Sequence, residues 1–238
     1  MILQGVRDLV LIRHGKSVRN IAEKSGPFFK NDDARKKFGA VRDRLIPLTQ
    51  KGIRQARKVG GGLKRKFGIP DLLFHSGFLR TIETTDGILM AYSKKESAKF
   101  KVLEKHLIRE RNSGYFIDFT EKEVREFFPW WNSYWHNHDR FLTAPFGGED
   151  FISMAEGRLL TFLKSLETIS YKKGGKKIFV VSHGRAILGL RYLLEDWSYK
   201  RMNRALAREN PPNCSVTYYK FDACGRPHLQ FANRIFRK

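Results

Sequence analysis

Short apolar runs recur along the chain, and several are followed by longer stretches with helical periodicity. Runs of about four to eight apolar residues, bounded by polar or turn residues, are typical of strands buried inside a sheet. The clearest runs lie at residues 8–12, 71–75 and 176–182. The sequence further predicts a strand at residues 100–103 and a closing pair at 215–221 and 228–236, with a turn at Gly225.

Four segments carry apolar residues at the spacing of a helix with one buried face. Thr49 is predicted to cap the first of them, because apolar residues recur at helical spacing directly after it. These residues are Ile53, Ala56, Val59 and Leu63. The glycines at 60–62 are expected to weaken the end of this helix. The other helices are predicted over residues 78–92, 151–170 and 184–194.

This alternation of strands and helices predicts an α/β fold. We expect a three-layer sandwich, in which a mostly parallel central sheet carries helices on both faces. No linker-like break interrupts the pattern, so residues 1–238 are expected to form one domain. Residues 21–46 are polar and basic and are interpreted as a long excursion with a short helix. Residues 105–150 are predicted to form an irregular, aromatic-rich insertion, of the kind that makes lids or pocket walls.

The composition excludes several classes of protein. With 41% hydrophobic and 29% charged residues, the chain is globular rather than disordered. Two cysteines, Cys214 and Cys224, cannot build a disulfide scaffold or a four-thiolate metal site, and they favour a reducing, cytoplasmic compartment. The N-terminal residues lack the pattern of a signal peptide. No apolar run approaches the roughly 20 residues that a membrane span needs.

The net charge is the unusual feature of the composition. Lysine and arginine number 46 against 24 acidic residues, which gives a formal charge of +22. Such a charge attracts anions, and nucleic acid, anionic lipid and small phosphorylated metabolites all fit it. A solvated, highly charged surface is the preferred interpretation of the charge. Charge alone does not choose among these partners, and the sequence does not indicate the oligomeric state.

Distinctive polar residues follow three of the predicted strands. The triplet Arg-His-Gly at 13–15 follows the first strand, residues 76–80 follow the second, and the pair His-Gly at 183–184 follows the clearest one. Because ligands of α/β sheets bind at the carboxyl ends of the strands, these residues are candidates for one site. The guanidinium forks of Arg13 and Arg80 match phosphate oxygens. Gly15 and Gly184 are expected to let the backbone approach a ligand closely.

These residues belong to an ordered set of motifs. The set comprises Arg13-His14-Gly15, Pro47-Leu48-Thr49 with Gly52 and Gln55-Ala56, Ser76 with Arg80-Thr81 and Thr84, Glu110 with Gly114, and Val181-Ser182-His183-Gly184. The set resembles the histidine phosphatase superfamily, whose fold is that of phosphoglycerate mutase. The resemblance spans about residues 9–187, and the segment 213–216 is similar to the family's closing strand.

The resemblance implies a role for each matching residue. His14 would be the nucleophile that carries the phosphoryl group, and Arg13, Arg80 and His183 would surround the phosphate. Glu110 would give a proton to the leaving oxygen and then activate water. Additional phosphate contacts are implied for Asn20, for Ser17 and for Gly184.

The departures from the family pattern favour a phosphatase over a mutase. Lys16 stands where many members have Glu or Gln, and Arg185 stands where mutases have Asn. The paired arginines of the mutases have no match in residues 128–146, and the segment 127–146 is expected to set substrate specificity. Asp150 replaces a serine of the family and is still expected to cap the following helix.

The sequence therefore predicts a phosphomonoester hydrolase that works through phosphohistidine, with no cofactor and no metal. A phosphoglycerate mutase or a sugar-bisphosphate phosphatase on the same fold is the alternative. A basic module that binds polyanions without turnover is a further alternative. His136, His138 and Asp139 suggest a metal site only weakly, and a solvent-facing aromatic loop is the preferred interpretation of that segment.

Overall fold

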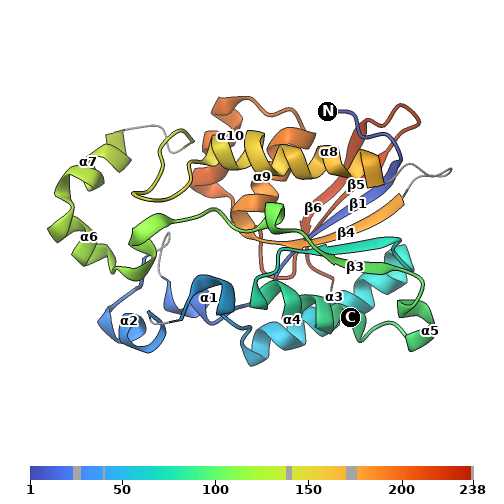
Figure 1. Ribbon diagram of the computed structural model, residues 1–238, viewed down its shortest axis with the longest axis horizontal. Helices are drawn as coiled ribbons and strands as arrows, with labels where there is room; N and C mark the ends of the chain where they lie inside the picture. Colours follow the sequence, from blue (N-terminus) through green and yellow to red (C-terminus); the bar gives the residue numbers. More distant parts are fainter. Residues whose placement is uncertain (24–27, 40, 138–140, 170–175, 237–238) are drawn as a thin grey trace.

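A six-stranded sheet runs through the middle of the molecule (Figure 1). The structure is a computed structural model, and it describes residues 1–23, 28–39, 41–137, 141–169 and 176–236. The strands are β1 (Val6–Arg13), β2 (Leu72–His75), β3 (Lys101–Glu104), β4 (Lys176–Ser182), β5 (Val216–Phe221) and β6 (Pro227–Arg234). Their order across the sheet is β3-β2-β4-β1-β5-β6. All six strands were expected from the sequence, with bounds that differ by at most two residues.

The sheet is mostly parallel, as the sequence predicted. The pairs β2–β3, β2–β4 and β1–β4 are parallel, whereas β5 pairs antiparallel with β1 and with β6. The closing pair is a hairpin, and Gly225 in its turn has a φ of 76°, a conformation that glycine adopts without strain. The carboxyl ends of β1, β2 and β4 therefore lie side by side at one edge of the sheet.

Helices cover both faces of the sheet. On one face lie α3 (Gln50–Phe67) and α4 (Leu79–Leu89), and on the other lie α8 (Leu160–Ile169), α9 (Gly184–Leu194) and α10 (Tyr199–Arg208) (Figure 1). Alternate residues of β1 enter different cores: Leu9 and Leu11 join the cluster under α8 and α9, whereas Val10 and Ile12 join the cluster under α3. Both faces of β1 are buried, which is why its sequence is an uninterrupted apolar run.

The helix α3 begins where the sequence predicted. The Thr49 side chain accepts a hydrogen bond from the Gly52 N–H at 3.0 Å and so caps the helix. The glycines at 60–62 do not end the helix, which continues to Phe67. A Cβ on Gly60 would lie 2.7 Å from the Ile88 backbone on α4, so this glycine allows the two helices to pack closely.

The predicted helix over 151–170 is present, but its first half is not an α-helix. Asp150 caps it as expected, since its carboxylate accepts from the Ser153 N–H at 2.7 Å. The segment Ser153–Leu159 is π-helical, and α8 continues from it. Periodicity did not reveal this widening, because the apolar residues stay on the buried side in both helix types.

A cap of short helices lies beyond the carboxyl edge of the sheet (Figure 1). It contains α1 (Arg19–Ala22), α2 (Asp32–Phe38), α6 (Glu121–Phe127) and α7 (Pro129–Asn137). The predicted irregularity of residues 105–150 is therefore wrong for the cap. Thr120 and Glu123 form a capping box at the start of α6, and Trp131 of α7 packs on Phe116 with 4.3 Å between ring centroids.

The remaining helical elements are short. They are α5 (Lys94–Ser97), the 3₁₀ turns η1 (Asp43–Leu45), η2 (His106–Ile108) and η3 (Gly114–Asp118), and the π-helical segment named above. Among the described residues, no helix is both long and apolar enough to cross a bilayer.

Candidate active site

Two imidazoles meet at the carboxyl edge of the sheet. His14 follows β1 and His183 follows β4, and these strands are neighbours. The His14 N–H donates to the Ser182 carbonyl at 2.9 Å, which fixes the two strand ends together. The ring centroids lie 5.1 Å apart with the planes inclined at 63°. Both side chains are buried, with 3% and 0% of their surfaces exposed.

The hydrogen bonding of His14 defines its tautomer. Its Nδ1 lies 2.7 Å from the Gly15 carbonyl oxygen. A carbonyl oxygen only accepts, so Nδ1 carries the proton, and in the neutral ring Nε2 keeps its lone pair. An imidazole held in this way presents Nε2 as a nucleophile.

Burial and neighbouring cations keep both imidazoles neutral. Desolvation lowers the pKa of His14 well below its ordinary value, and the charges of Arg80 and Arg13 lower it further. The pKa of His183 is also well below its ordinary value, because of burial first and then of Arg80. Neither group needs to lose a proton at neutral pH before its lone pair is available.

The ring of His183 is held from both sides. Arg80 Nε donates to its Nδ1 at 3.4 Å, so the proton of the neutral ring sits on Nε2, which donates to Ser76 Oγ at 2.8 Å. Ser76 in turn donates to Thr81 Oγ1 at 3.0 Å, and Thr81 Oγ1 donates to the Phe78 carbonyl at 2.7 Å. This series of hydrogen bonds fixes the orientation of His183 from the first turn of α4.

Arg80 holds a carboxylate in this structure. Its Nη1 donates to Asp43 Oδ1 at 3.0 Å and its Nη2 donates to Asp43 Oδ2 at 3.2 Å, which is a two-point contact. Its Nη1 also donates to the Asp43 backbone carbonyl at 2.7 Å. The guanidinium is 6% exposed and the carboxylate 30%, so the anion sits on the solvent side of the pair. The fork of Arg80 therefore already binds a planar anion.

Arg13 is buried and has one donor without a partner. Its Nη1 donates to Asn210 Oδ1 at 2.9 Å and to the Pro211 carbonyl. Its Nε has no hydrogen-bond partner among the described residues, although it is buried. Burial lowers the pKa of this arginine from its ordinary value, and the charge of Glu110 opposes that shift. A buried N–H of a cation without a partner is costly, and an anion in the site would satisfy it.

Glu110 lies at the N-terminus of α9. Its two carboxylate oxygens accept from the backbone N–H of Arg185 at 3.3 Å and of Ala186 at 3.2 Å. These residues come two and three positions after His183, so the carboxylate is close to the pair of imidazoles. The neighbouring Arg111 is desolvated and lies near Arg185, and together these effects lower its pKa to about 10.

Ser17 and Asn20 use part of their hydrogen-bonding capacity on the loop after His14. The Ser17 N–H donates to Asn20 Oδ1 at 3.2 Å, and the Asn20 N–H donates to Ser17 Oγ at 3.3 Å. Asn213 Nδ2 donates both to Asn20 Oδ1 and to the His14 carbonyl, each at 3.1 Å. These contacts leave the Nδ2 amide group of Asn20 and the hydroxyl proton of Ser17 for a ligand.

The glycines after the two histidines serve different purposes. A Cβ on Gly15 would lie 2.6 Å from the Gly52 carbonyl oxygen, so Gly15 is required by the close approach of α3, not by a ligand. A Cβ on Gly184 would lie 3.5 Å from Arg13 Nε and from Asn210 Oδ1, which is ordinary contact. The expectation of a close ligand approach is therefore wrong for Gly15, where another part of the backbone fills that space.

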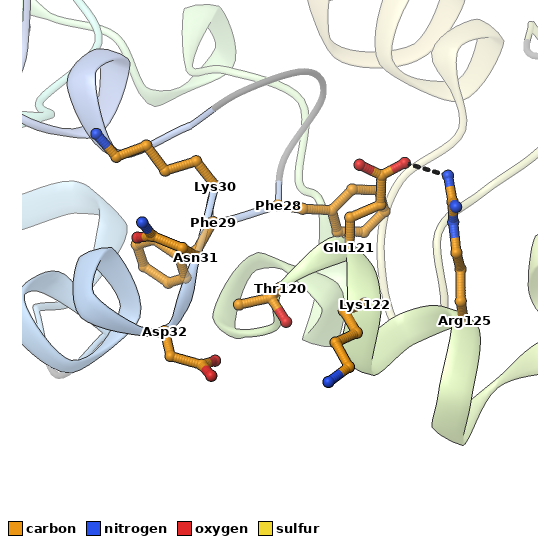
Figure 2. A pocket seen from close by; sticks show the side chains of 9 residues that line it. All are labelled: Phe28, Phe29, Lys30, Asn31, Asp32, Thr120, Glu121, Lys122 and Arg125. Carbon is orange, nitrogen blue, oxygen red and sulfur yellow. Dashed lines mark hydrogen bonds and ion pairs between the residues drawn. The ribbon is translucent and has the colours of Figure 1, made fainter.

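Two surface pockets lie in and beside the cap. The larger one, of about 420 Å³, is formed by residues 28–32 and by residues 120–125, and it contains none of the site residues (Figure 2). The smaller one, of about 270 Å³, is lined in part by Arg19, Arg42 and Asp43. Because Asp43 also contacts Arg80, this second pocket adjoins the phosphate-binding candidates.

Among the described residues of the segment 127–146, none lines the smaller pocket. Trp131 is 4% exposed and belongs to the core of the cap, while Trp130 is 57% exposed. The side chains of Trp135 and His136, and residues 138 and 139 with them, lie outside the described part of the chain. Among the described residues, no cluster of three His, Cys, Asp or Glu side chains is arranged to hold a metal ion.

Sequence reasoning named the imidazoles and arginines but missed their partners. Asp43 and Asn210 reach the site from 37 and 197 positions away along the chain. Ser76 was named among the residues that follow the second strand, but its hydrogen bond to His183 was not predicted. Its place directly after β2 was the available signal, because the other residues of the site also follow strands directly.

Comparison with known proteins extends the motif analysis to nearly the whole chain. The sequence model of the histidine phosphatase superfamily (branch 1) matches residues 9–234. A relative from Rhizobium etli, named 2,3-bisphosphoglycerate-dependent phosphoglycerate mutase, is 28% identical over 211 residues, which cover 88% of this chain and 89% of the relative. A protein of the same name from Bifidobacterium longum is 24% identical over 239 residues, covering 92% and 88%.

Solved structures show the same fold. The alpha-ribazole phosphatase from Shigella flexneri superposes with a TM-score of 0.73 at 21% identity, over 95% of this chain and 96% of that chain. The mycobacterial glucosyl-3-phosphoglycerate phosphatase in complex with VO3 superposes with a TM-score of 0.71 at 20% identity, over 95% and 98%. These likenesses confirm the predicted α/β architecture.

Proposed function

The chain belongs to the histidine phosphatase superfamily, and on that premise we propose that it hydrolyses phosphomonoesters through a phosphohistidine at His14. The observation that carries the proposal is the neutral imidazole of His14, whose Nε2 keeps its lone pair and whose ring feels the charges of the buried Arg80 and Arg13. Phosphoryl transfer needs positioning and compensation of negative charge more than other chemistry. Arg13 and Arg80 supply that positive charge in this proposal, and His183 completes the group around the phosphate.

The first half-reaction transfers the phosphoryl group to the enzyme. His14 Nε2 donates its lone pair to phosphorus, an N–P bond forms, and the bond to the ester oxygen breaks in line with the attack. Glu110, in its protonated form, gives its proton to the departing oxygen, so that an alcohol leaves rather than an alkoxide. The unpartnered Nε of Arg13 supports this arrangement, because a phosphoryl oxygen would satisfy it.

The second half-reaction returns the enzyme to its starting state. Glu110, now a carboxylate, removes a proton from water, and the water oxygen attacks phosphorus. The N–P bond breaks, its electron pair returns to Nε2, and phosphate leaves. Because Glu110 accepts two backbone N–H groups at the start of α9, it is held in one place for both steps.

Substrate binding requires an exchange at Arg80. The carboxylate of Asp43 occupies the guanidinium fork, and a phosphoryl group has the same two-oxygen geometry. We propose that the incoming phosphoryl group replaces this carboxylate, and that η1, which carries Asp43, moves away from Arg80. The leaving group would then occupy the pocket beside Arg19 and Arg42. Ser17, Asn20 and Gly184 are proposed to complete the contacts to phosphate.

A phosphoglycerate mutase is the second candidate, because the relatives with that name cover most of the chain. The pair Glu110-Arg111 also resembles the mutase pattern. Arg185 in place of asparagine, and the absence of paired arginines from residues 128–146, favour the phosphatase. A mutase must return the phosphoryl group to a second hydroxyl before water attacks, whereas a phosphatase must admit water.

Product analysis separates these functions. The protein is incubated with a panel of phosphomonoesters that includes sugar bisphosphates and both monophosphoglycerates, and phosphate and isomers are measured together. Release of phosphate supports the phosphatase, and interconversion of phosphoglycerates without release supports the mutase. The His14→Asn variant should abolish either activity, and His228→Asn, at an exposed histidine, is the matched control. No turnover of any substrate would leave a module that binds polyanions without catalysis.

The compartment, the domain organisation and the substrate class of the enzyme are further parts of the proposal. Both cysteines are free, Cys214 buried and Cys224 exposed, which supports a reducing, cytoplasmic compartment. The family match from residue 9 to residue 234 supports a single domain over residues 1–238. A small phosphorylated molecule is the proposed substrate, and the positive charge of the chain would attract it.

A further inference from the structure

The helix α3 is the most basic element of the described chain. Its 18 residues include seven lysines and arginines and no acidic residue. Its buried face is built from small and apolar residues, among them Ala56, Val59 and Leu63, which pack on the sheet and on α4. The basic residues have no role in that packing and lie on the opposite side.

Six of these seven cations are exposed and available. They are Lys51, Arg54, Arg57, Lys58, Arg65 and Lys66. None of them has an ion pair or a hydrogen bond with any described residue, and Lys66 alone stacks on aromatic rings. Positions 51, 54, 58 and 65 follow the helical repeat, so these four side chains form one stripe along α3.

The basic surface continues beyond the C-terminal end of α3. Lys64, the seventh cation, pairs with Glu96 of α5 at 2.7 Å and joins the two helices (Figure 1). Residues 94–101 carry four exposed lysines besides that one glutamate. The cationic face, defined as the exposed basic residues of α3 together with Lys94, Lys95, Lys99 and Lys101, therefore extends over both helices.

Few carboxylates offset this charge. On the neighbouring helix α4, Glu83 accepts a hydrogen bond from the Leu48 N–H, and Asp86 is exposed. Glu96 already pairs with Lys64. Like charges held this close repel one another, and an ordered polyanion would relieve that repulsion.

We propose that the cationic face binds the phosphate backbone of nucleic acid. The stripe from Lys51 to Arg65 covers about 21 Å at 1.5 Å per residue. A nucleic-acid strand carries about six phosphates over that length. Lysine and arginine side chains without a fixed partner are the groups that neutralise such phosphates, and their contacts carry no base specificity.

The chemistry of the face argues against a lipid surface. Helices that bind membranes place large apolar side chains into the boundary between headgroups and acyl chains. Neither α3 nor α5 has an exposed large apolar side chain, and the apolar face of α3 is buried in the core. The face thus offers charge without an apolar anchor, which suits a hydrated phosphate backbone.

The test compares two sets of equal charge removal. The first variant is Arg54→Gln, Lys58→Gln and Arg65→Gln combined. The matched control removes three exposed cations from α10, on the opposite face of the sheet, and is Lys200→Gln, Arg204→Gln and Arg208→Gln combined. Fluorescence anisotropy measures binding to a labelled DNA duplex of about 20 base pairs between about 50 and 200 mM salt. Circular dichroism and thermal unfolding confirm that both variants fold, and this check does not depend on enzymatic activity.

We expect the α3 variant to bind the duplex at least about tenfold more weakly than the wild type. The slope of the logarithm of its binding constant against the logarithm of the salt concentration should be shallower by about three, because three phosphate contacts are lost. The α10 control should keep most of the wild-type slope. Equal losses in both variants would overturn the proposal, since net charge rather than this face would then govern binding. It is also overturned if the wild-type protein ignores the duplex but binds phosphatidylserine vesicles through α3.

Discussion

The two neutral imidazoles make the folded protein sensitive to acid. An unfolded histidine has a pKa of about 6.5. In the folded protein, burial and the nearby guanidinium groups hold the pKa values of His14 and His183 well below that. The unfolded chain therefore binds protons that the folded chain does not. The stabilisation is complete above the unfolded pKa and is lost as the pH falls below it.

As long as both rings stay neutral in the folded protein, the size of this loss of stability depends only on the protonation of the two histidines in the unfolded chain. One pH unit below the unfolded pKa, about ten unfolded histidines are protonated for each neutral one, which favours unfolding by about 1.4 kcal/mol per histidine. Two buried histidines together cost about 3 kcal/mol at about pH 5.5. That is a large share of the 5–15 kcal/mol typical of a folded domain.

Urea unfolding followed by tryptophan fluorescence measures this effect between about pH 8 and pH 5.5. Other groups titrate as well, so the useful quantity is a difference between proteins. His14→Asn keeps a side-chain donor near the Gly15 carbonyl, and its acid-induced loss should be smaller than that of the wild type by about 1.4 kcal/mol. His228→Asn is the control, because that ring is 59% exposed and should not reproduce the difference. If His14→Asn lost as much stability as the wild type, the neutral, buried imidazole would be refuted.

Three further substitutions test the neighbours of the imidazoles. Glu110→Gln should lower kcat/KM, which reports the transfer to His14, by about 10²–10⁴ on alkyl phosphates and much less on nitrophenyl phosphates, whose leaving group needs no proton; equal losses of kcat/KM on both would reject its role as the acid. Ser76→Ala removes the acceptor of the His183 Nε2–H, and steady-state kinetics should show a lower kcat and a shifted pH profile, whereas an unchanged profile would make Ser76 merely structural. Asp43→Asn weakens the competitor for the Arg80 fork, so vanadate should inhibit the variant at lower concentration than the wild type; weaker inhibition would mean that Asp43 holds Arg80 in place instead.

The strands of the central sheet were predictable because the signal for each strand lies within its own residues. Strands such as β1 and β4 are buried on both faces, so their apolar runs stand out from the charged surroundings. The helices α6, α7 and α10 were missed for a different reason. Their stability comes from contacts distant in sequence, such as Trp131 on Phe116 and the burial of Met202 of α10 in the main core, and seven to ten residues give little periodicity.

The residues of the site also divide into those that the sequence revealed and those that it did not. His14, Arg13 and His183 were found because each lies next to the end of a strand, and the topology of an α/β sheet brings such ends together. Asp43 comes from a 3₁₀ turn in the polar excursion, and nothing in its own neighbourhood indicates that it reaches Arg80. Partners of this kind depend on the path of the whole chain, which a single sequence does not reveal.

The covalent intermediate tests the account most directly. The protein is mixed with a phosphomonoester that it hydrolyses, quenched within a turnover, digested and analysed by mass spectrometry under conditions that preserve acid-labile phosphate. The account predicts one phosphopeptide, modified at His14, that disappears in acid and is absent from His14→Asn. Phosphate on another residue, or hydrolysis that persists in His14→Asn, would contradict it.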